Sequence, residues 1–334
     1  MTIKDIARLS GCGIGTVSRV INKQPGVSDK TREKILKVIE ASNYEPNESA
    51  RQLKRRSGDA ITIIVKGRHN LFFANILSDI MQILSSVDEI GSGQIIDEDA
   101  DEVAEALKLV RDRTSKGIIF LGANLALFDE RMKEIDIPCV IATTSAAELP
   151  FQNVCSVSVN DEEATTELVR YLTSRGHKEM VVLGGAISEK QISYSRYIGC
   201  KKGFEESGLE FTPEHNYKAC RYSMEAGYKA TREILENNPN VTAIVGLSDK
   251  IAIGAIRAIY DAGKKVPEDI SVVGFDGTEL AEYYIPRITA IRQDTTSIAK
   301  RSVELITKHI HYSLESEHDF APYELVEGES VRDI

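Results

Sequence analysis

The sequence predicts an α/β protein that consists of a small all-helical N-terminal domain and a large two-lobed body. Three observations predict this class. The first 58 residues show helical periodicity, whereas from residue 60 onward short β-rich runs alternate with helical stretches. Such alternation is typical of parallel, doubly wound sheets that helices cover on both faces. The third observation is length: most of the 334 residues lie in this alternating part, which is too long for one such sheet. Two lobes with a cleft at the carboxyl ends of the strands are therefore expected.

The chain begins with a pattern for a short helix over 3–10. Ile3, Ile6 and Ala7 recur at helical spacing, and Thr2 stands where an N-cap belongs. Glycines then interrupt the periodicity, as at a tight turn.

A second helix is expected over 14–22, with Val17 and Val20 on one face and Arg19 on the opposite face. A third is expected over 29–42, behind a capping serine. A short helix, a glycine turn and a helix with one apolar and one hydrogen-bonding face are typical of a helix-turn-helix. A phosphate-binding glycine loop is not expected, because no strand precedes the glycines.

Charge separates the two parts of the chain. The net charge is −10, but residues 1–58 carry 12 Lys and Arg against 6 Asp and Glu, whereas the remainder carries 29 against 45. A basic head of +6 on an acidic body of −16 indicates a DNA-binding module joined to a part that avoids DNA.

The first 47 residues closely resemble the head of the lactose/galactose repressor (LacI–GalR) family. The segments that carry the resemblance are T-I-K-D-I-A-R-L-S-G-C-G-I-G-T-V-S-R-V-I-N, V-S-D-K-T-R-E-K-I and N-Y-E-P-N. The resemblance implies that residues 14–22 enter the major groove of double-stranded operator DNA. Ile14, Gly15 and Arg19 would face bases, and Arg19 suits a bidentate contact with guanine. The family usually has Ser or Thr where this chain has Gly13.

Residues 47–58 resemble the family's hinge helix. So short a helix is marginal alone, because nucleation is costly, and it is expected to form when paired across a homodimer on DNA. Leu53 matches the leucine that the family wedges into the minor groove. A charged linker with an incidental leucine is the alternative. The DNA-binding residues implied in all are Thr2, Ile14, Gly15, Thr16, Ser18, Arg19, Asn22, Thr31, Tyr44, Asn47, Ala50, Arg51, Leu53 and Lys54.

The body is predicted from its alternating pattern. Strands are expected at 60–66, 117–121, 138–142, 154–159, 179–184, 242–246 and 270–274, and helices at 73–86, 101–113, 161–175, 197–207, 224–236, 249–262 and 295–312. The stretch 86–99 follows neither pattern.

The family resemblance continues through the body, at G-I-I-F-L, R-G-H-K-E-M-V-V-L-G-G, S-D-K-I-A-I-G-A-I-R-A-I and V-P-E-D-I-S-V-V-G-F-D-G-T. It implies a periplasmic-binding-protein-like fold whose lobes exchange strands near 158–161 and 289–293. The expected domains are a helix-turn-helix domain at 1–46, a hinge at 47–58 and a body at 59–334. The N-lobe would take about 59–158 and 292–320, and the C-lobe about 159–291 and 321–334, with the final strand ending near Asp333 and Ile334.

A small effector, a sugar or sugar derivative, is expected in the cleft. Arg196 and Asp276 resemble the family's ligand-binding arginine and aspartate, and such charges supply strong hydrogen bonds to hydroxyls. Alanine at either position is expected to abolish the effector response and to leave DNA binding intact. The full set of expected effector-binding residues is Asn70, Phe72, Phe73, Asn160, Asp161, Arg196, Tyr222, Ser248, Asp249 and Asp276.

Several of these residues have a structural alternative. Asp249 opens a helix, so it is as well suited to an N-terminal cap as to a ligand contact. Each aromatic residue is as well suited to the core as to a sugar platform. Asn160 and Asp161 reverse the order usual in the family, and Ser248 stands where the family commonly has Asn.

Other function classes are disfavoured. The sequence contains no nucleophile elbow and no strand-bounded glycine loop, so an enzyme is not expected, and no cofactor is expected. The five cysteines and six histidines show no metal spacing, so no metal is expected. No apolar run of membrane-spanning length and no signal segment is present, so a cytoplasmic protein without membrane contact is expected.

The alternative functions are a regulator controlled by a protein partner and a solute-binding protein. Because no heptad tail follows the body, a dimer is expected rather than a tetramer. The sign of the switch, induction or corepression, stays open.

Overall fold

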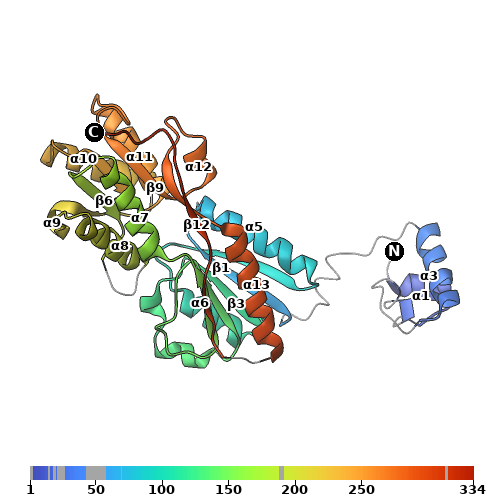
Figure 1. The fold of residues 1–334 in the computed structure, drawn as a ribbon. Helices are drawn as coiled ribbons and strands as arrows, with labels where there is room; N and C mark the ends of the chain where they lie inside the picture. The colour runs from blue at the N-terminus through green and yellow to red at the C-terminus, as the bar shows by residue number, and fades with distance from the viewer. Residues whose placement is uncertain are drawn as a thin grey trace. The chain divides into compact units, whose positions relative to one another are not determined.

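The computed structural model describes residues 3–13, 16–17, 20, 27–42, 58–68, 70–187, 192–312 and 315–334 (Figure 1). The chain divides into two compact units, Met1–Asp59 and Ala60–Ile334.

The N-terminal unit is helical, as predicted. Its helices are α1 (Ile3–Ser10) and α3 (Asp29–Ala41), and Thr16, Val17 and Val20 are also helical. The Oγ of Ser28 accepts a hydrogen bond from the backbone N–H of Thr31 at 3.4 Å, which is the N-cap that the sequence predicted for α3. The buried core of this unit consists of Ile6, Ala7, Val17, Val20 and Ile35.

The body contains two six-stranded sheets, one in each lobe (Figure 1). The N-lobe sheet has the strand order β11-β5-β4-β3-β1-β2, and all its pairings are parallel. Its strands are β1 (Ala60–Lys66), β2 (Ile90–Ile96), β3 (Gly117–Leu121), β4 (Cys139–Ala142), β5 (Val154–Ser158) and β11 (His318–Phe320).

The C-lobe sheet has the order β12-β10-β9-β8-β6-β7, in which β12 alone pairs antiparallel. Its strands are β6 (Met180–Gly184), β7 (Tyr217–Ala219), β8 (Ala243–Gly246), β9 (Ser271–Asp276), β10 (Thr289–Gln293) and β12 (Tyr323–Val326). The sheets are mainly parallel, as predicted, and the exception is β12, the edge strand that returns from the N-lobe.

Helices cover both faces of each sheet. In the N-lobe, α5 (Leu71–Ser86) and α13 (Thr295–Tyr312) pack against each other over one face, and α6 (Glu102–Arg111) lies on the other with the 3-10 turns Leu125–Leu127 and Glu130–Glu134. In the C-lobe, α7 (Asp161–Ser174) and α8 (Ile192–Glu206) cover one face, and α10 (Met224–Asn237) and α11 (Asp249–Asp261) cover the other. The short helices α9 (Pro213–Asn216) and α12 (Glu279–Glu282) complete the lobe.

Several segments differ from the sequence-based expectation, and β7, β10 and β11 were not among the expected strands. The unassigned stretch 86–99 contains β2, an edge strand whose exposed residues and two glycines hide the apolar pattern of a strand. Helix α8 begins at Ile192, one turn before the expected start, so Arg196 lies within it. The final strand ends at Val326, not near Asp333, although the last residue still donates its N–H to the carbonyl of Arg175.

The chain crosses between the lobes three times. The first crossing lies between β5 and α7, the second between β10 and α13, and the third between β11 and β12. At the last two crossings the backbones are joined, because the N–H of Asp294 donates to the carbonyl of Pro322 at 3.1 Å. No helix in the described ranges has the length and apolar character needed to cross a bilayer.

Candidate functional site

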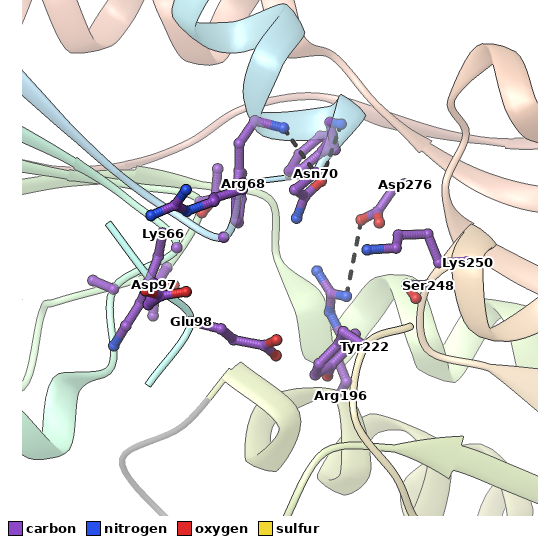
Figure 2. Close-up of a pocket in the computed structure, with 17 residues that line it drawn as sticks. Lys66, Arg68, Asn70, Asp97, Glu98, Arg196, Tyr222, Ser248, Lys250 and Asp276 are labelled. Carbon is purple, nitrogen blue, oxygen red and sulfur yellow. Dashed lines mark hydrogen bonds and ion pairs between the residues drawn. The ribbon is translucent and has the colours of Figure 1, made fainter. Parts of the chain in front are cut away.

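A cavity of about 390 Å³ lies between the two lobes (Figure 2). This volume is within the range of ordinary small-molecule sites. The lining residues come from strand ends, loops and helices of both lobes, and they are Lys66, Gly67, Arg68, Asn70, Phe72, Phe73, Asp97, Glu98, Gly122, Ala123, Thr143, Thr144, Arg196, Tyr222, Ser248, Lys250 and Asp276.

The cavity lies at the carboxyl ends of the parallel strands, because these ends meet at one edge of each sheet. In the N-lobe, Lys66 ends β1, Asp97 follows β2 and Thr143 follows β4. In the C-lobe, Ser248 lies just beyond β8 and Asp276 ends β9. Residues that are far apart in the sequence are thereby brought to one cavity, as the doubly wound pattern predicted.

Arg196 lies at the C-lobe side of the cavity and is almost entirely buried. Its Nε donates to Oδ1 of Asp161 at 2.8 Å, and its Nη1 donates to the carbonyl of Leu247 at 2.8 Å. The guanidinium also stacks over the ring of Phe275, 3.8 Å from its centroid. Although burial opposes its charge, the carboxylates of Asp161 and Asp276 raise the pKa of Arg196, so it stays cationic.

Asp276 faces Arg196 across 4.0 Å and has an unusual backbone conformation (Figure 2). Its φ of 104° lies in a region that residues with a Cβ rarely adopt. Gln293, at the end of β10, donates its Nε2 to Oδ1 of Asp276 at 2.8 Å. Burial raises the pKa of Asp276, and the nearby carboxylate of Asp249 raises it further, whereas Arg196 and Gln293 lower it. Strained backbone of this kind is common at ligand sites.

Asp249 lies behind the cavity wall, and neither of its two expected roles describes it. The cap of α11 is Ser248, whose Oγ accepts from the N–H of Ile251 at 3.3 Å. Asp249 is buried, and its Oδ2 accepts from both the N–H and the Oγ1 of Thr278. Its Oδ1 has no hydrogen-bond partner, and burial raises the pKa of this carboxyl. Asp249 therefore holds the loop after β9 rather than lining the cavity.

Lys66 provides a cation on the N-lobe side that the sequence analysis did not identify. Its Nζ donates to Oε2 of Glu102 at 2.6 Å, and both side chains are nearly buried. The other oxygen of Glu102 accepts from the N–H of Asn124 at 2.6 Å. Lys66 is thus a fixed part of the wall, and the carboxylate of Glu102 compensates its charge.

The aromatic residues divide between core and wall. Phe72 belongs to the N-lobe core, and Phe73, also packed against that core, lies so close to Gly122 that a Cβ there would overlap its ring. Tyr222 packs between the two C-lobe clusters, and its hydroxyl lies 3.0 Å from Oγ of Ser193. All three still contribute surface to the cavity.

The cavity brings together most of the expected effector-binding residues. Those that line it are Asn70, Phe72, Phe73, Arg196, Tyr222, Ser248 and Asp276. Asn160, Asp161 and Asp249 do not line it. Asn160 caps α7 through the N–H of Glu163, and Asp161 pairs with Arg196 from behind. Their role in the structure is to support the wall.

Several polar residues that were not expected from the sequence also line the cavity, namely Lys66, Arg68, Asp97, Glu98, Thr143, Thr144 and Lys250. Most follow the ends of predicted strands, so their place beyond a carboxyl end was the available signal. Asp97 and Glu98 follow β2, which the sequence did not reveal.

Of the expected DNA-binding residues, the structure describes only Thr16 and Thr31. The N–H of Thr16 donates to the carbonyl of Gly13, which continues the turn after α1. Thr31 lies in the first turn of α3, and its Oγ1 is 2.9 Å from Oγ of Ser28. Outside the described residues lie Thr2, Ile14, Gly15, Ser18, Arg19, Asn22, Tyr44, Asn47, Ala50, Arg51, Leu53 and Lys54.

The described cysteines and histidines do not form a metal site, and the buried ones pack within the lobes. Among the described residues, no group of three or more His, Cys, Asp or Glu side chains is placed to hold a metal ion. Cys139, Cys155 and Cys200 are buried, and burial raises the pKa of each thiol. His177 is buried between Thr242 and the carbonyl of Arg332, where it has a structural role.

Comparisons with known proteins match both units. Residues 2–47 match the family model "Bacterial regulatory proteins, lacI family", and residues 169–331 match "Periplasmic binding protein-like domain". The HTH-type transcriptional regulator MalR of Clostridium butyricum is 36% identical over 340 residues, which cover 100% of both chains.

Solved structures share the fold. The lac repressor dimer bound to operator and the anti-inducer ONPF superposes with a TM-score of 0.82 over 99% of both chains, at 24% identity. The complex of the transcriptional regulator CelR with cellobiose gives a TM-score of 0.71, also at 24% identity and 99% coverage of both.

A helix-turn-helix unit joined to a two-lobed body with an interlobe cavity defines a DNA-binding transcription regulator with a ligand-binding domain. The chain belongs to the LacI family of bacterial regulatory proteins, whose members are regulators and not enzymes.

Proposed function

We propose that this regulator is a repressor that binds a pseudo-palindromic operator as a homodimer and that a sugar or sugar derivative in the interlobe cavity switches its affinity for DNA. The observation that carries the proposal is the cavity itself, in which both lobes present hydrogen-bonding side chains beside aromatic surface. A ligand that contacts both lobes has different affinities for different lobe arrangements, which is the thermodynamic requirement for a switch.

The chemistry of the lining supports a ligand rich in hydroxyl groups. Carboxylates and guanidinium groups form strong, charge-assisted hydrogen bonds with hydroxyls. The ring surfaces of Phe73 and Tyr222 suit the apolar faces of a sugar ring. CelR, which shares this fold, is solved with cellobiose.

The N-terminal unit supports operator binding. Residues 2–47 match the family's regulatory domain, and residues 1–58 carry a net positive charge although the chain as a whole is acidic. Recognition is proposed to depend on Arg19 for base contacts, whereas Thr16 and Thr31 contact phosphates. A two-fold dimer would bind two half-sites one or more helical turns apart.

Exposed apolar side chains on the body support a second copy as partner. Exposed apolar surface of a protein can form an interface with a second copy. Large exposed apolar residues of the described body include Met81 on α5, which lies beside Gly91 of β2, and Ile95 on β2 itself. The lac repressor of the same fold is solved as a dimer.

One experiment tests the DNA half of the proposal. Operator sequences are selected from a random double-stranded library with the full chain, and binding is measured by fluorescence anisotropy while the mass of the complex is measured by ultracentrifugation. A two-fold symmetric sequence bound by two chains is expected. Enrichment of no sequence, or binding by a single chain to an asymmetric site, would contradict it.

A second experiment tests the effector. A thermal-shift screen of the full chain against sugars, sugar phosphates, nucleosides and amino acids should give a rise of a few degrees for the effector, because a ligand at 100 times its Kd stabilises the folded state by about 2.7 kcal/mol. Operator binding is then measured again in the presence of the ligand found in the screen, which shows whether the effector weakens or strengthens DNA binding. Weaker DNA binding indicates induction, and stronger binding indicates corepression.

A further inference from the structure

The charges around the cavity suggest which ligands the site accepts. Four cations line the wall: Lys66, Arg68, Arg196 and Lys250. Two of them are directly compensated by buried carboxylates, because Lys66 pairs with Glu102 and Arg196 pairs with Asp161.

Three more carboxylates belong to the lining itself. They are Asp97, Glu98 and Asp276. Even when Asp276 keeps its proton, the four cations of the wall face four other carboxylates, two in the lining and two directly behind it. The site has no surplus of positive charge for an anionic ligand, whose own charge would have to be desolvated on binding.

Helix N-termini do not supply the missing positive potential. Helices α5 and α11 both begin at the cavity, and such ends commonly bind phosphate through free amides. Here Oδ1 of Asn70 accepts from the N–H groups of Phe72 and Phe73, and Oγ of Ser248 accepts from that of Ile251. The N–H groups of Phe72, Phe73 and Ile251 are therefore already engaged by cap side chains, and Asp249 adds a negative charge to the first turn of α11.

Glu98 is the lining carboxylate best placed to discriminate between neutral and anionic ligands. It extends from the N-lobe loop after β2 toward the C-lobe side of the cavity, where Arg196 and Tyr222 lie (Figure 2). No hydrogen bond or ion pair of its side chain is recorded within the described parts of the chain, in contrast to the neighbouring Asp99, which pairs with Arg221. Its oxygens can accept hydrogen bonds from ligand hydroxyls, and its charge repels an anion.

We infer that the cavity selects an uncharged saccharide over the phosphorylated or carboxylated form of the same sugar, and that Glu98 is a residue that determines this specificity. The inference rests on the proposed function, since it concerns the ligand class of the same site.

The test uses matched probes and the full chain. Glucose and cellobiose are compared with glucose 6-phosphate, cellobiose phosphate and glucuronic acid by thermal shift and then by calorimetry. The neutral probe of a pair should bind at least about tenfold more tightly than its anionic counterpart, because an uncompensated like charge in a closed site costs more than ~1.4 kcal/mol.

Variants at position 98 separate charge from shape. Glu98→Gln should reduce the preference for the neutral probe, and Glu98→Lys should reduce it further or reverse it. Glu148→Lys is the matched control, because Glu148 is exposed in the same lobe and does not line the cavity. It makes the same change in net charge and should leave the preference unchanged.

The outcomes separate the two proposals. Tighter binding of a phosphorylated or carboxylated probe to the wild-type chain would overturn the inference and leave the proposed function intact. An equal preference in wild type and in both Glu98 variants would overturn the role of Glu98. A panel in which no saccharide of any kind binds would contradict the proposed effector class, and the inference with it.

Discussion

Asp99 and Arg221 join the two lobes at the edge of the cavity. Nη2 of Arg221, in the loop before α10, donates to Oδ2 of Asp99, in the loop after β2, at 2.6 Å. Each residue is next in sequence to one that lines the cavity, Glu98 on one side and Tyr222 on the other. The pair therefore links two lining segments from opposite lobes.

We expect this ion pair to bias the lobes toward the closed arrangement. Both side chains are largely exposed, so the pair contributes about 0.2–1 kcal/mol and is weakened by salt. Asp99→Asn should lower the ratio of closed to open molecules by a factor of about 1.4 to 5, and exchange of the two charges, Asp99→Arg with Arg221→Asp, should restore it.

The measurement is the distance distribution between spin labels at exposed positions 112 and 268, one in each lobe, after serine replaces Cys12 and Cys220. Glu225→Gln is the control, because the Glu225–Lys229 pair has similar exposure but lies within one helix. A distribution that Asp99→Asn leaves unchanged would show that the pair does not hold the lobes.

Arg196→Ala is expected to destabilise the body and not only to remove a ligand contact. It would leave the buried carboxylate of Asp161 without a cation, and breaking a buried pair of this kind costs about 3–5 kcal/mol. Chemical denaturation should show this loss, whereas Arg170→Ala, which breaks an exposed pair with Glu206, should change stability by at most about 1 kcal/mol. The sequence led us to expect that alanine at Arg196 would remove only the effector response. The structure leads us to expect a loss of stability as well.

Asp276→Asn is the cleaner test of effector binding. Asn keeps the size of the side chain and tolerates a positive φ better than most residues, so the fold should persist. We expect unchanged operator binding and a loss of the thermal shift with the effector found in the screen. A full effector response in this variant would exclude Asp276 from the ligand site.

The contribution of Asp249 and Asp276 to stability is expected to fall as pH rises from about 4 toward neutrality. Burial raises the pKa of Asp249 and of Asp276, so the folded state retains protons that the unfolded state has already lost. The folded state therefore binds more protons than the unfolded state in this window, which makes the slope of stability against pH negative for these groups. Melting temperatures of Asp249→Asn should decline less steeply than those of wild type, and Asp112→Asn, at an exposed position, should follow wild type.

Gly199 is expected to resist replacement by alanine although it lies inside a helix. Alanine favours a helix over glycine by about 1 kcal/mol. A Cβ at this position, however, would overlap the carbonyl oxygen of Glu162 and the hydroxyl of Thr165 on α7. Overpacking costs about 1–3 kcal/mol, and backbone cannot move aside as a flexible side chain can, so Gly199→Ala should lower the melting temperature. Lys201→Ala on the exposed face of α8 is the control.

Arg19→Ala should reduce discrimination between the selected operator and single-base variants by about 1–3 kcal/mol. Replacing a residue that contacts only phosphate should instead weaken binding to all sequences alike. Anisotropy titrations at constant salt measure both effects. An unchanged order of preference among the operator variants would rule out base contact by Arg19.

Much of the fold could be predicted because buried elements leave a periodic signal. Strands β1 and β3 lie where the sequence placed them, since their residues are buried on both faces and form continuous apolar runs. The edge strand β2 was missed for the opposite reason. Its residues Ser92, Gly93 and Ile95 are exposed and only Ile96 is buried, so the strand has no continuous apolar run.

The candidate site was predictable in part. Arg196, Tyr222 and Asp276 stand in recognisable segments and do line the cavity. Asn160 and Asp161 also stand in such a segment, but the start of α7 lies behind the wall, so Asn160 caps the helix and Asp161 compensates Arg196. Position in a motif did not reveal which side of the wall a side chain would occupy.

The sequence by itself determined the family, the helix-turn-helix head and the alternating order of the body, because these depend on local periodicity, caps and short motifs. Only the tertiary structure decided which charges meet. Glu102 compensates Lys66 across 36 positions, and Arg221 reaches Asp99 across 122. Such pairings follow from the order of strands in each sheet and from the approach of the two lobes, and no local pattern encodes them. The first of these pairings compensates a cation of the cavity wall, and the second joins the two lobes beside the cavity.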